Sequence, residues 1–398
     1  MAESPQAALS RIPSDRSRRI QRSMPLALLV FITVLAHTAY NGTRLTFSLE
    51  ALSLGATPLV VGSLVSLMAA LPMALGVFSG RLVDRMGTRK PIILAVGGVI
   101  AGITVAAAFP GIALLPVVAV SVGSSFALFH ICVQHMVGEM SDPARRRDNF
   151  SLLALGFAIS NFLGPTISGV AIDHLGHRAT FCILAVFACV SLTILFARRA
   201  ALSHTEHHSR NREPRSALEL LRDRELRLVF IVSGLLASAW DLFTFVMPIY
   251  GNSIGLSATT IGLILGSFAA ATFVVRLMLP WIQRRIREWP LITVTFAIAC
   301  VAYAAFPMVR TVPLLASISF LLGFGLGATQ PSIMALVYAT APKGRAAEAV
   351  GLRTVALNTS TTVFPIFFGG LGSVVGMTPV FLGMAALLAA GGVVSRRR

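Results

Sequence analysis

Charged residues are scarce in this sequence, and acids are scarcer than bases. Only 12% of its 398 residues are Asp, Glu, Lys or Arg, and 55% are hydrophobic. A soluble domain carries about 25% charged residues. Because so much apolar surface cannot be hidden inside a water-facing globule, the composition excludes a soluble protein and indicates a chain that crosses a membrane several times.

Motifs for catalysis and for ATP binding are also missing. The sequence has no phosphate-binding loop, so we do not expect ATP as an energy source. It shows no paired catalytic carboxylates and no Ser/His/Asp constellation. The four cysteines lie in apolar segments without metal-ligand spacing. Histidines at 204–208 offer either a metal site or simple polar residues. We expect a protein that is not an enzyme, without cofactor or resident metal.

Apolar segments of about 20 residues, the length of a membrane-spanning helix, are what the sequence does contain. Their composition is helical and does not alternate as the strands of a barrel do. The predicted fold is therefore an all-α membrane protein with twelve transmembrane helices. They occupy residues 25–47, 57–80, 91–109, 113–135, 150–172, 179–198, 228–250, 257–280, 290–309, 313–337, 349–371 and 377–395.

The basic residues are unevenly distributed between the connecting segments. The net charge of +17 is compatible with nucleic-acid binding, but 29 of the 33 Lys and Arg residues fall on segments that share one side of the membrane. Such a bias marks the cytoplasmic side. We therefore interpret the charge as topogenic, expect no nucleic-acid partner, and predict a multi-pass protein of the bacterial inner membrane with both termini in the cytoplasm.

The sequence repeats weakly with a period of 200 residues. Aligned pairs are Gly55 and Gly255, Gly62 and Gly262, Gly123 and Gly323, Pro165 and Pro365, and Gly169 and Gly369. The repeat predicts two six-helix bundles in the same orientation, at 25–198 and 228–398. A basic tail at 1–24 precedes them, and a polar cytoplasmic linker at 199–227 joins them. The end of the linker, 216–223, is typical of an amphipathic surface helix.

A short charged stretch at 80–91 lies between the second and third apolar segments. Its glycines and charges are Gly80, Asp84, Arg85, Gly87, Arg89 and Lys90, with Arg81 beside them. A carboxylate at a helix end can cap a neighbouring helix or pair with arginine, for example Arg145–Arg147, only while that face is closed. We therefore interpret Asp84 as part of a conformational latch. The alternative is a solvated, topogenic loop. Arg284 occupies the equivalent place in the second half.

The stretch resembles the G-x-L-x-D-R-x-G-R-R-x signature of the major facilitator superfamily, with Thr88 where that family usually has a basic residue. The resemblance implies a twelve-span transporter that switches between inward and outward states, with this turn taking part in the switch. Another resemblance lies at 160–169, where Gly164, Pro165 and Gly169 match a segment of the family's exporters. That match favours export, with Gly164, Pro165, Gly169 and Pro365 as packing and hinge residues. The alternative is packing alone.

Several polar residues within the spans are candidates for a cavity. Among the sixteen acids only Asp241 lies deep in a span, where it is the repeat partner of Asn41. We interpret it as the site of proton coupling or of cationic-substrate binding, the alternative being an ion pair with Arg44 or Arg276. Arg44 could bind an anionic substrate group or reach the membrane surface. The other candidates are His130, Gln330 and Asn358.

The sequence as a whole predicts a secondary active transporter. Our first hypothesis is proton-coupled export of a small amphiphilic drug or metabolite by alternating access, an antiport. The second is proton-coupled uptake of a small organic solute, and a remote third is a non-transporting receptor or assembly protein. The expected partners are the small-molecule substrate, protons and the lipid bilayer, and we expect a monomer.

Overall fold

The computed structural model describes residues 25–141, 145–198, 220, 222–342 and 345–396. These ranges contain helices and no strand, which confirms the predicted all-helical fold. Nine of the described helices are long and apolar enough to cross a membrane. Large apolar side chains such as Leu94, Val186 and Val301 are about 60% exposed, as lipid-facing positions require (64%, 60% and 62%).

The described residues of the first half form five continuous helices. They are α3 (Leu26–Ser53), α4 (Pro58–Met86), α5 (Arg89–Ala108), α6 (Leu115–Met140) and α7 (Arg146–Ala197). Helix α7 contains both the fifth and the sixth predicted span, because its backbone is broken at Gly176, where φ is 80°. Only glycine adopts such an angle without steric cost.

The second half repeats this order. Its helices are α8 (Arg224–Ser253), α9 (Ala258–Gln283), α10 (Glu288–Ala305), a 3-10 turn η3 (Phe306–Met308), α11 (Val312–Gly327), α12 (Thr329–Thr340), α13 (Ala346–Val375) and α14 (Met377–Arg396). Helices α11 and α12 together form the tenth predicted span. Gly376, at the equivalent place to Gly176, has a φ of 83°. The backbone therefore follows the 200-residue repeat.

The turn predicted at 80–91 is much shorter in the structure. Helix α4 continues to Met86 and α5 begins at Arg89, so only Gly87 and Thr88 lie between them. The end of the apolar run marks the membrane boundary and not the end of the helix, since a helix can continue into water with its charged side chains solvated. Gly87, with a φ of 70°, makes the reversal.

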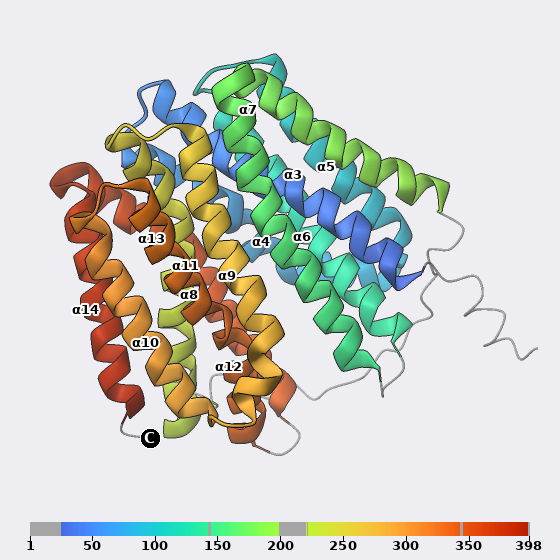
Figure 1. Ribbon diagram of the computed structural model, residues 1–398. Helices are drawn as coiled ribbons and strands as arrows, with labels where there is room; N and C mark the ends of the chain where they lie inside the picture. Colours follow the sequence, from blue (N-terminus) through green and yellow to red (C-terminus); the bar gives the residue numbers. More distant parts are fainter. Residues whose placement is uncertain (1–24, 142–144, 199–219, 221, 343–344, 397–398) are drawn as a thin grey trace, which may run out of the picture.

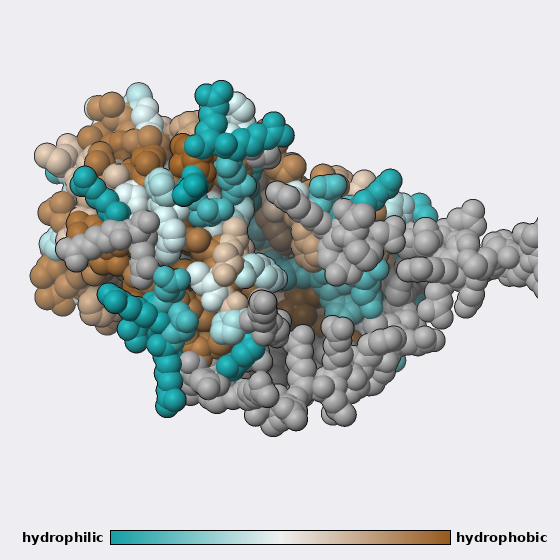
Figure 2. Space-filling model, turned by 90° about the horizontal axis from the view of Figure 1, so that it is seen from below, coloured by the Kyte–Doolittle hydropathy of each residue, from teal (hydrophilic) through white to brown (hydrophobic). Residues whose placement is uncertain are grey.

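The two halves lie side by side (Figure 1). Helices α7 and α9 pack against each other across the seam, as do α4 and α13. We call the end of the molecule that holds Pro25 and Arg396 the basic end. We call the opposite end, with the connections at 54–57, 109–114 and 254–257, the far end. Seen from the basic end, a hollow separates the halves, with hydrophilic side chains around it (Figure 2).

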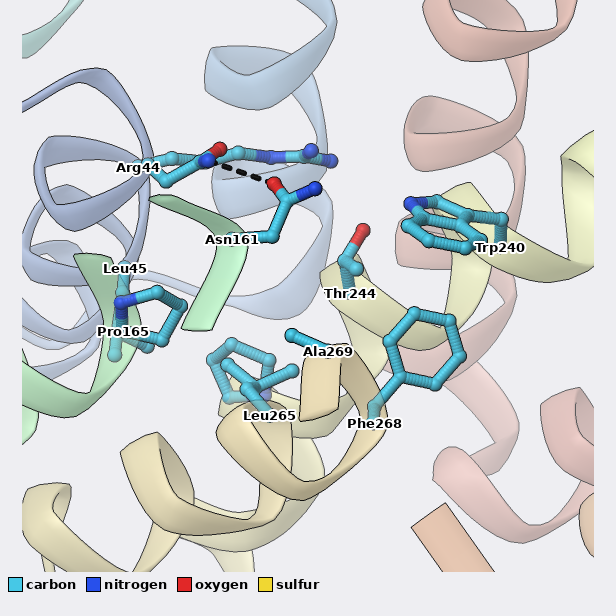
Figure 3. A pocket seen from close by; sticks show the side chains of 11 residues that line it. Arg44, Leu45, Asn161, Pro165, Trp240, Thr244, Leu265, Phe268 and Ala269 are labelled. Atoms are coloured by element: carbon cyan, nitrogen blue, oxygen red, sulfur yellow. Dashed lines mark hydrogen bonds between the residues drawn. The ribbon is translucent and has the colours of Figure 1, made fainter. Parts of the chain in front are cut away.

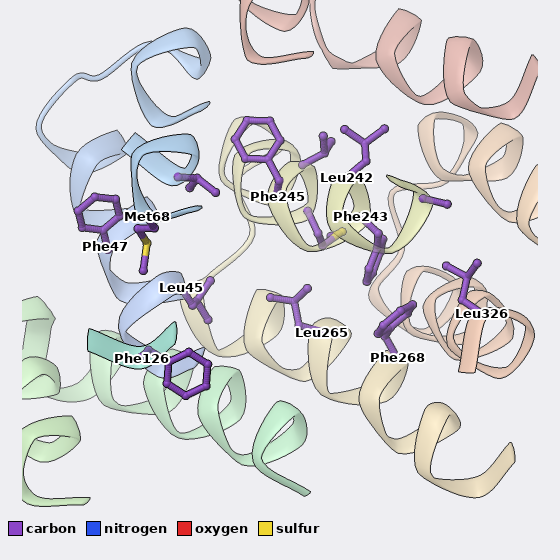
Figure 4. Packing of buried hydrophobic residues seen from close by; sticks show 14 of the residues in the cluster. Leu45, Phe47, Met68, Phe126, Leu242, Phe243, Phe245, Leu265, Phe268 and Leu326 are labelled. Atoms are coloured by element: carbon purple, nitrogen blue, oxygen red, sulfur yellow. The ribbon is translucent and has the colours of Figure 1, made fainter. Parts of the chain in front are cut away.

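Buried hydrophobic residues form a core that extends through both halves. Leu45 of α3 and Phe126 of α6 belong to it, as do Leu265 and Phe268 of α9 (Figure 4). Because lipid is as apolar as this core, contact between helices depends on close packing more than on exclusion of water. The repeat pair Gly123 and Gly323 illustrates this, since a Cβ on either would overlap the backbone of Met68 or Phe268, which are themselves repeat partners.

Candidate functional site

The larger cavity lies within the second half and has a volume of about 280 Å³. Four helices contribute to its wall, namely α8, α9, α12 and α13. The residues that line it are Ser233, Leu236, Ala237, Trp240, Asp241, Arg276, Thr329, Gln330, Ile333, Arg353, Leu357 and Thr361. It thus holds one carboxylate, two guanidinium groups and an apolar wall, which is a combination suited to a small molecule with a charged group.

Asp241 lies on α8 in the wall of this cavity. Its Oδ2 accepts a hydrogen bond of 2.8 Å from the Thr361 hydroxyl of α13. Among the described residues, Asp241 forms no ion pair. The alternative of a direct ion pair with Arg44 or Arg276 is therefore not what the structure shows.

Arg353 is the most deeply buried basic residue of the site, with 6% of its side chain exposed. Its Nε donates to the Ser233 hydroxyl at 2.6 Å, and its Nη2 donates to Gln330 Oε1 at 2.8 Å. Arg353 lies near the start of the predicted span 349–371. In the structure it belongs to α13 and lines the cavity. The polar composition of the eleventh span was the available signal.

A smaller pocket of about 70 Å³ lies on the seam between the halves. Arg44 and Asn161 of the first half face Thr244 and Trp240 of the second half across it (Figure 3). Asn41 also lines this pocket. The Nη2 atom of Arg44 is buried and has no hydrogen-bond partner among the described residues. Trp240 lines both this pocket and the larger cavity, so the two spaces adjoin.

Asn41 belongs to a hydrogen-bonded chain in the first half. Its Nδ2 donates to Asn161 Oδ1 at 2.7 Å and lies 3.2 Å from His37 Nε2. The other ring nitrogen of His37 lies 2.6 Å from the Ser160 hydroxyl. If Asn41 donates to Nε2, His37 is neutral with its proton on Nδ1. The sequence gives no signal for this role of His37, because no spacing in it pairs His37 with Ser160.

The remaining candidate residues lie in different places. Gln330 lines the larger cavity and contacts Arg353. His130 packs on Phe157, with ring centroids 5.0 Å apart, and lines neither cavity. Asn358 is exposed on α13 and lines neither cavity either. Gly164 packs against α3, where a Cβ would lie 2.8 Å from that of Asn41.

At the far end, equivalent contacts join the halves twice. A Cβ on Gly62 of α4 would overlap the carbonyl of Pro365 in α13, and one on Gly262 of α9 would overlap that of Pro165 in α7. Gly169 packs in the same way on Ala258. Small residues are needed at these points because backbone meets backbone.

Side-chain caps reinforce both far-end contacts. The Asp173 carboxylate accepts hydrogen bonds from the backbone N–H groups of Ala258, at 3.0 Å, and Thr259, at 2.7 Å, at the start of α9. At the equivalent place, the Ser373 hydroxyl accepts from the N–H of Leu59 at 2.9 Å. Only the first cap is charged, and an anion is favourable at a helix N-terminus.

Asp173 lies between the predicted spans 150–172 and 179–198, where burial and local hydrogen bonds act on its ionisation in opposite directions. Burial alone would raise the pKa of its carboxyl, but the hydrogen bonds from Thr259, Ser257 and Ala258 together lower the pKa below its ordinary value of 3.8. The carboxylate is therefore ionised at neutral pH.

The predicted latch lies at the basic end. The side chains of Asp84, Arg85 and Gly80 lie outside the described residues, so the latch stays a prediction. Arg89 is half-buried and Lys90 is exposed at the start of α5. The tail at 1–24 and the predicted surface helix at 216–223, except for residues 220, 222 and 223, also lie outside the described residues.

Comparisons with known proteins place this geometry in context. The family model described as Major Facilitator Superfamily matches residues 29–354. Among curated protein sequences, none matches this chain significantly.

Solved structures share the fold at low sequence identity. A mutant of a POT peptide transporter is similar with a TM-score of 0.78 at 16% identity, over 96% of this chain and 98% of that chain. A POT family transporter in complex with 5-aminolevulinic acid has a TM-score of 0.77 at 15% identity, over 94% and 98%. A mutant of the nucleoside transporter NupG has a TM-score of 0.77 at 12% identity, over 94% and 99%.

Proposed function

Because the chain belongs to the Major Facilitator Superfamily and is a secondary transporter, we propose that it couples proton movement to the transport of a small, partly apolar organic compound through the cavity at Asp241. The neighbours in structure carry peptides and nucleosides by their names, which supports a small organic solute. We expect it to act as a monomer in a bacterial inner membrane, with both termini in the cytoplasm.

The observation that carries the proposal is the Asp241 carboxylate. Among the described residues that line the two cavities it is the one acid. An ionisable group at membrane depth is costly and is retained where it has a task. Asp241 accepts a hydrogen bond from Thr361 and forms no ion pair among the described residues, so its carboxylate is available to bind a proton.

Alternating access supplies the transport step. The paired glycine contacts and the two caps at the far end support the proposal that this arrangement is the state closed at that end. In the other state these contacts separate, and the stretch at 80–91 closes the basic end with Asp84 as its latch.

Export is the first of two candidate directions. Support comes from Gly164, Pro165 and Gly169, which match the exporters' segment and which lie on α7 where it packs against α3 and α9. In export by antiport, proton and substrate compete for the same cavity. Proton-coupled uptake is the second candidate, and in it proton and substrate move together. The charge of the residues around the cavity helps to distinguish export from uptake.

Inside-out membrane vesicles test coupling and direction together. Growth of a drug-sensitive bacterial host on a panel of toxic amphiphilic compounds first identifies a compound that the chain transports. In vesicles with an acidic lumen, export by antiport predicts accumulation of that compound above its external concentration. Accumulation with an alkaline lumen instead identifies cotransport. Movement that ignores the gradient in both arrangements contradicts proton coupling. Vesicles that carry Asp241→Asn are the matched control and should show no response to the gradient.

A further inference from the structure

The residues around the two cavities carry more positive than negative charge. Arg276 and Arg353 line the larger cavity, Arg44 lines the smaller one, and Asp241 is the one carboxylate among the described lining residues. The two spaces share Trp240 and form one electrostatic environment. Removing a guanidinium from water is costly unless an anion balances it. Three arginines and one carboxylate leave an excess of positive charge, which a negatively charged ligand would balance.

Arg353 is the residue best placed to bind such a ligand. A guanidinium has five N–H donors. Its contacts among the described residues are with neutral atoms only, namely the Ser233 hydroxyl, the Gln330 carbonyl and, at 3.5 Å, the Met334 sulfur. These contacts hold the plane of the guanidinium and leave two N–H groups without a partner among the described residues. A side chain that is 94% buried and oriented by two hydrogen bonds is a built binding group.

The other two arginines also lack acidic partners among the described residues. Arg44 has a buried Nη2 with no hydrogen-bond partner. Arg276 donates from Nη1 to the carbonyl of Ala154 at 3.0 Å, which is a neutral acceptor on the first half. Neither arginine forms an ion pair among the described residues, so the excess of positive charge around the cavities does not depend on Arg353 alone.

We propose that the larger cavity binds the carboxylate group of a small aromatic or aliphatic acid, with Arg353 as the principal donor. Leu236, Trp240, Ile333 and Leu357 supply the apolar wall for the rest of the molecule. The volume of about 280 Å³ is at the lower limit of ordinary ligand pockets, roughly 300–1,000 Å³. It suits a compound with one ring or a short chain. A cationic substrate, by contrast, would meet three like charges.

An ionised Asp241 weakens the binding of such a ligand, because two carboxylates in one cavity repel each other. The charged groups around it are Arg44 from α3, Arg276 from α9 and Arg353 from α13. If Asp241 holds the proton of the proposed function, on which this step rests, the acid binds more readily to the protonated site. Proton and substrate then enter the cavity together, which favours the uptake candidate over exchange.

Tryptophan fluorescence can test this proposal on the purified full chain in detergent. The sequence contains three tryptophans, so the Trp281→Phe/Trp289→Phe variant reports from Trp240 in the cavity wall alone. The probes are 4-nitrobenzoate and 4-nitrobenzamide, which both quench indole and differ in charge but hardly in shape. We expect 4-nitrobenzoate to bind with a Kd about tenfold lower than that of the amide, as the loss of a charge-assisted hydrogen bond implies.

Charge variants give opposite signs, which separates binding from misfolding. Arg353→Gln should weaken 4-nitrobenzoate binding about tenfold and leave the amide unchanged, whereas Arg353→Lys should retain part of the preference. Asp241→Asn should strengthen 4-nitrobenzoate binding, a gain that a damaged protein would not show. Arg310→Gln, at an exposed far-end position, is the control and should change nothing.

Two outcomes overturn the proposal. The first is a Kd for the amide equal to or lower than that for the carboxylate, and the second is weaker carboxylate binding in Asp241→Asn. The proposed function fails separately. Carboxylate binding without any response to a proton gradient contradicts the coupling but not the site, and gradient-driven transport of a neutral or cationic compound by a chain that does not prefer 4-nitrobenzoate contradicts the site but not the coupling.

Discussion

The far end and the cavity treat the 200-residue repeat in opposite ways. At the far end, Gly62 on Pro365 is repeated by Gly262 on Pro165. In the cavity region the contact between Asn41 and Asn161 is repeated by that between Asp241 and Thr361. The backbone positions correspond, but a neutral amide pair in the first half becomes a carboxylate and a hydroxyl in the second. The two halves therefore share their packing contacts but differ in the charge of the equivalent residues.

This difference suggests a division of labour. Symmetric contacts suit a movement in which both halves rock about one axis, because both sides of the gate must open together. An asymmetric cavity suits recognition, since a small solute has no such symmetry. Leu153 is the repeat partner of Arg353 and is buried, which shows that the first half fills with an apolar side chain the position that holds charge in the second.

The largest expected effect comes from breaking the symmetric packing. Gly62→Leu or Gly262→Leu places a side chain where the carbonyl of Pro365 or Pro165 lies, so the far end cannot close. We expect loss of transport by more than about tenfold, because volume added where backbones touch is poorly accommodated. Spin labels can be placed at the exposed repeat partners Ile112 and Val312 in a chain without the native cysteines. The distance between the two labels should be longer in the leucine variants than in the chain that keeps the glycines.

The control for this experiment is Gly234→Leu, because nothing lies within 4 Å of a Cβ at Gly234. A Gly62→Leu protein whose label distances match those of the unmodified chain contradicts the role given to the far-end contact.

A smaller effect is expected from the charged cap. Asp173→Asn removes the negative charge at the start of α9 while keeping an acceptor oxygen. A charge in this position contributes up to about 1 kcal/mol where exposed to solvent. The population of the open state, read from the label distance between positions 112 and 312, should therefore rise by a few fold. Ser373→Asp adds the missing charge on the other side and should shift it the opposite way. Equal label distances in both variants would show that the caps do not stabilise the closed far end.

The same cap predicts a pH window. Because hydrogen bonds in the closed state lower the pKa of Asp173 below 3.8, the stabilisation is fully present above that value. It is lost as pH falls through the lowered pKa. Between pH 5 and 8, taken as a range well above the ordinary carboxyl pKa, the contribution of Asp173 to the label distance should be constant. A change in this range that disappears in Asp173→Asn would show that the assignment of the charge is wrong.

The smallest effect is expected where a single hydrogen bond is removed. Thr361→Val keeps the shape of the side chain but takes away the donor to Asp241. Transport of the compound identified in the host screen should fall by a few fold, since the net contribution of one hydrogen bond is about 0.5–1.5 kcal/mol and water replaces part of it. Asn161→Leu, at the repeat position, removes the equivalent acceptor from Asn41. A larger effect at Asn161 than at Thr361 would reverse the comparison between the halves.

The sequence predicted the helical fold because membrane-spanning length and positive charge bias are local signals. It also indicated that Asp241 and Asn41 are repeat partners, as are Gly62 and Gly262 and Pro165 and Pro365. That the halves meet at these glycines and prolines is seen only in the structure. Gln330 was among the predicted cavity residues, and the structure places it in the cavity wall. These residues could be found because register and composition carry the information.

The rest depended on contacts between distant segments. The sequence places Arg353 near the start of the predicted span 349–371, but it does not reveal that this side chain lines a cavity. The cap formed by Asp173 on α9 joins residues 85 positions apart in the chain, and no spacing in the sequence indicates it. The pairing of His37 with Ser160 has the same character. Which polar side chains share a cavity is decided by helix rotation, which residue types alone do not report.

The central claim is that the charge of the second half, at Asp241, links transport to protons. The most direct test compares gradient-driven accumulation with downhill exchange of the same compound in vesicles that carry Asp241→Asn. We expect that exchange continues and that accumulation against the concentration gradient is abolished. An Asp241→Asn chain that still accumulates the compound as the unmodified chain does would contradict it.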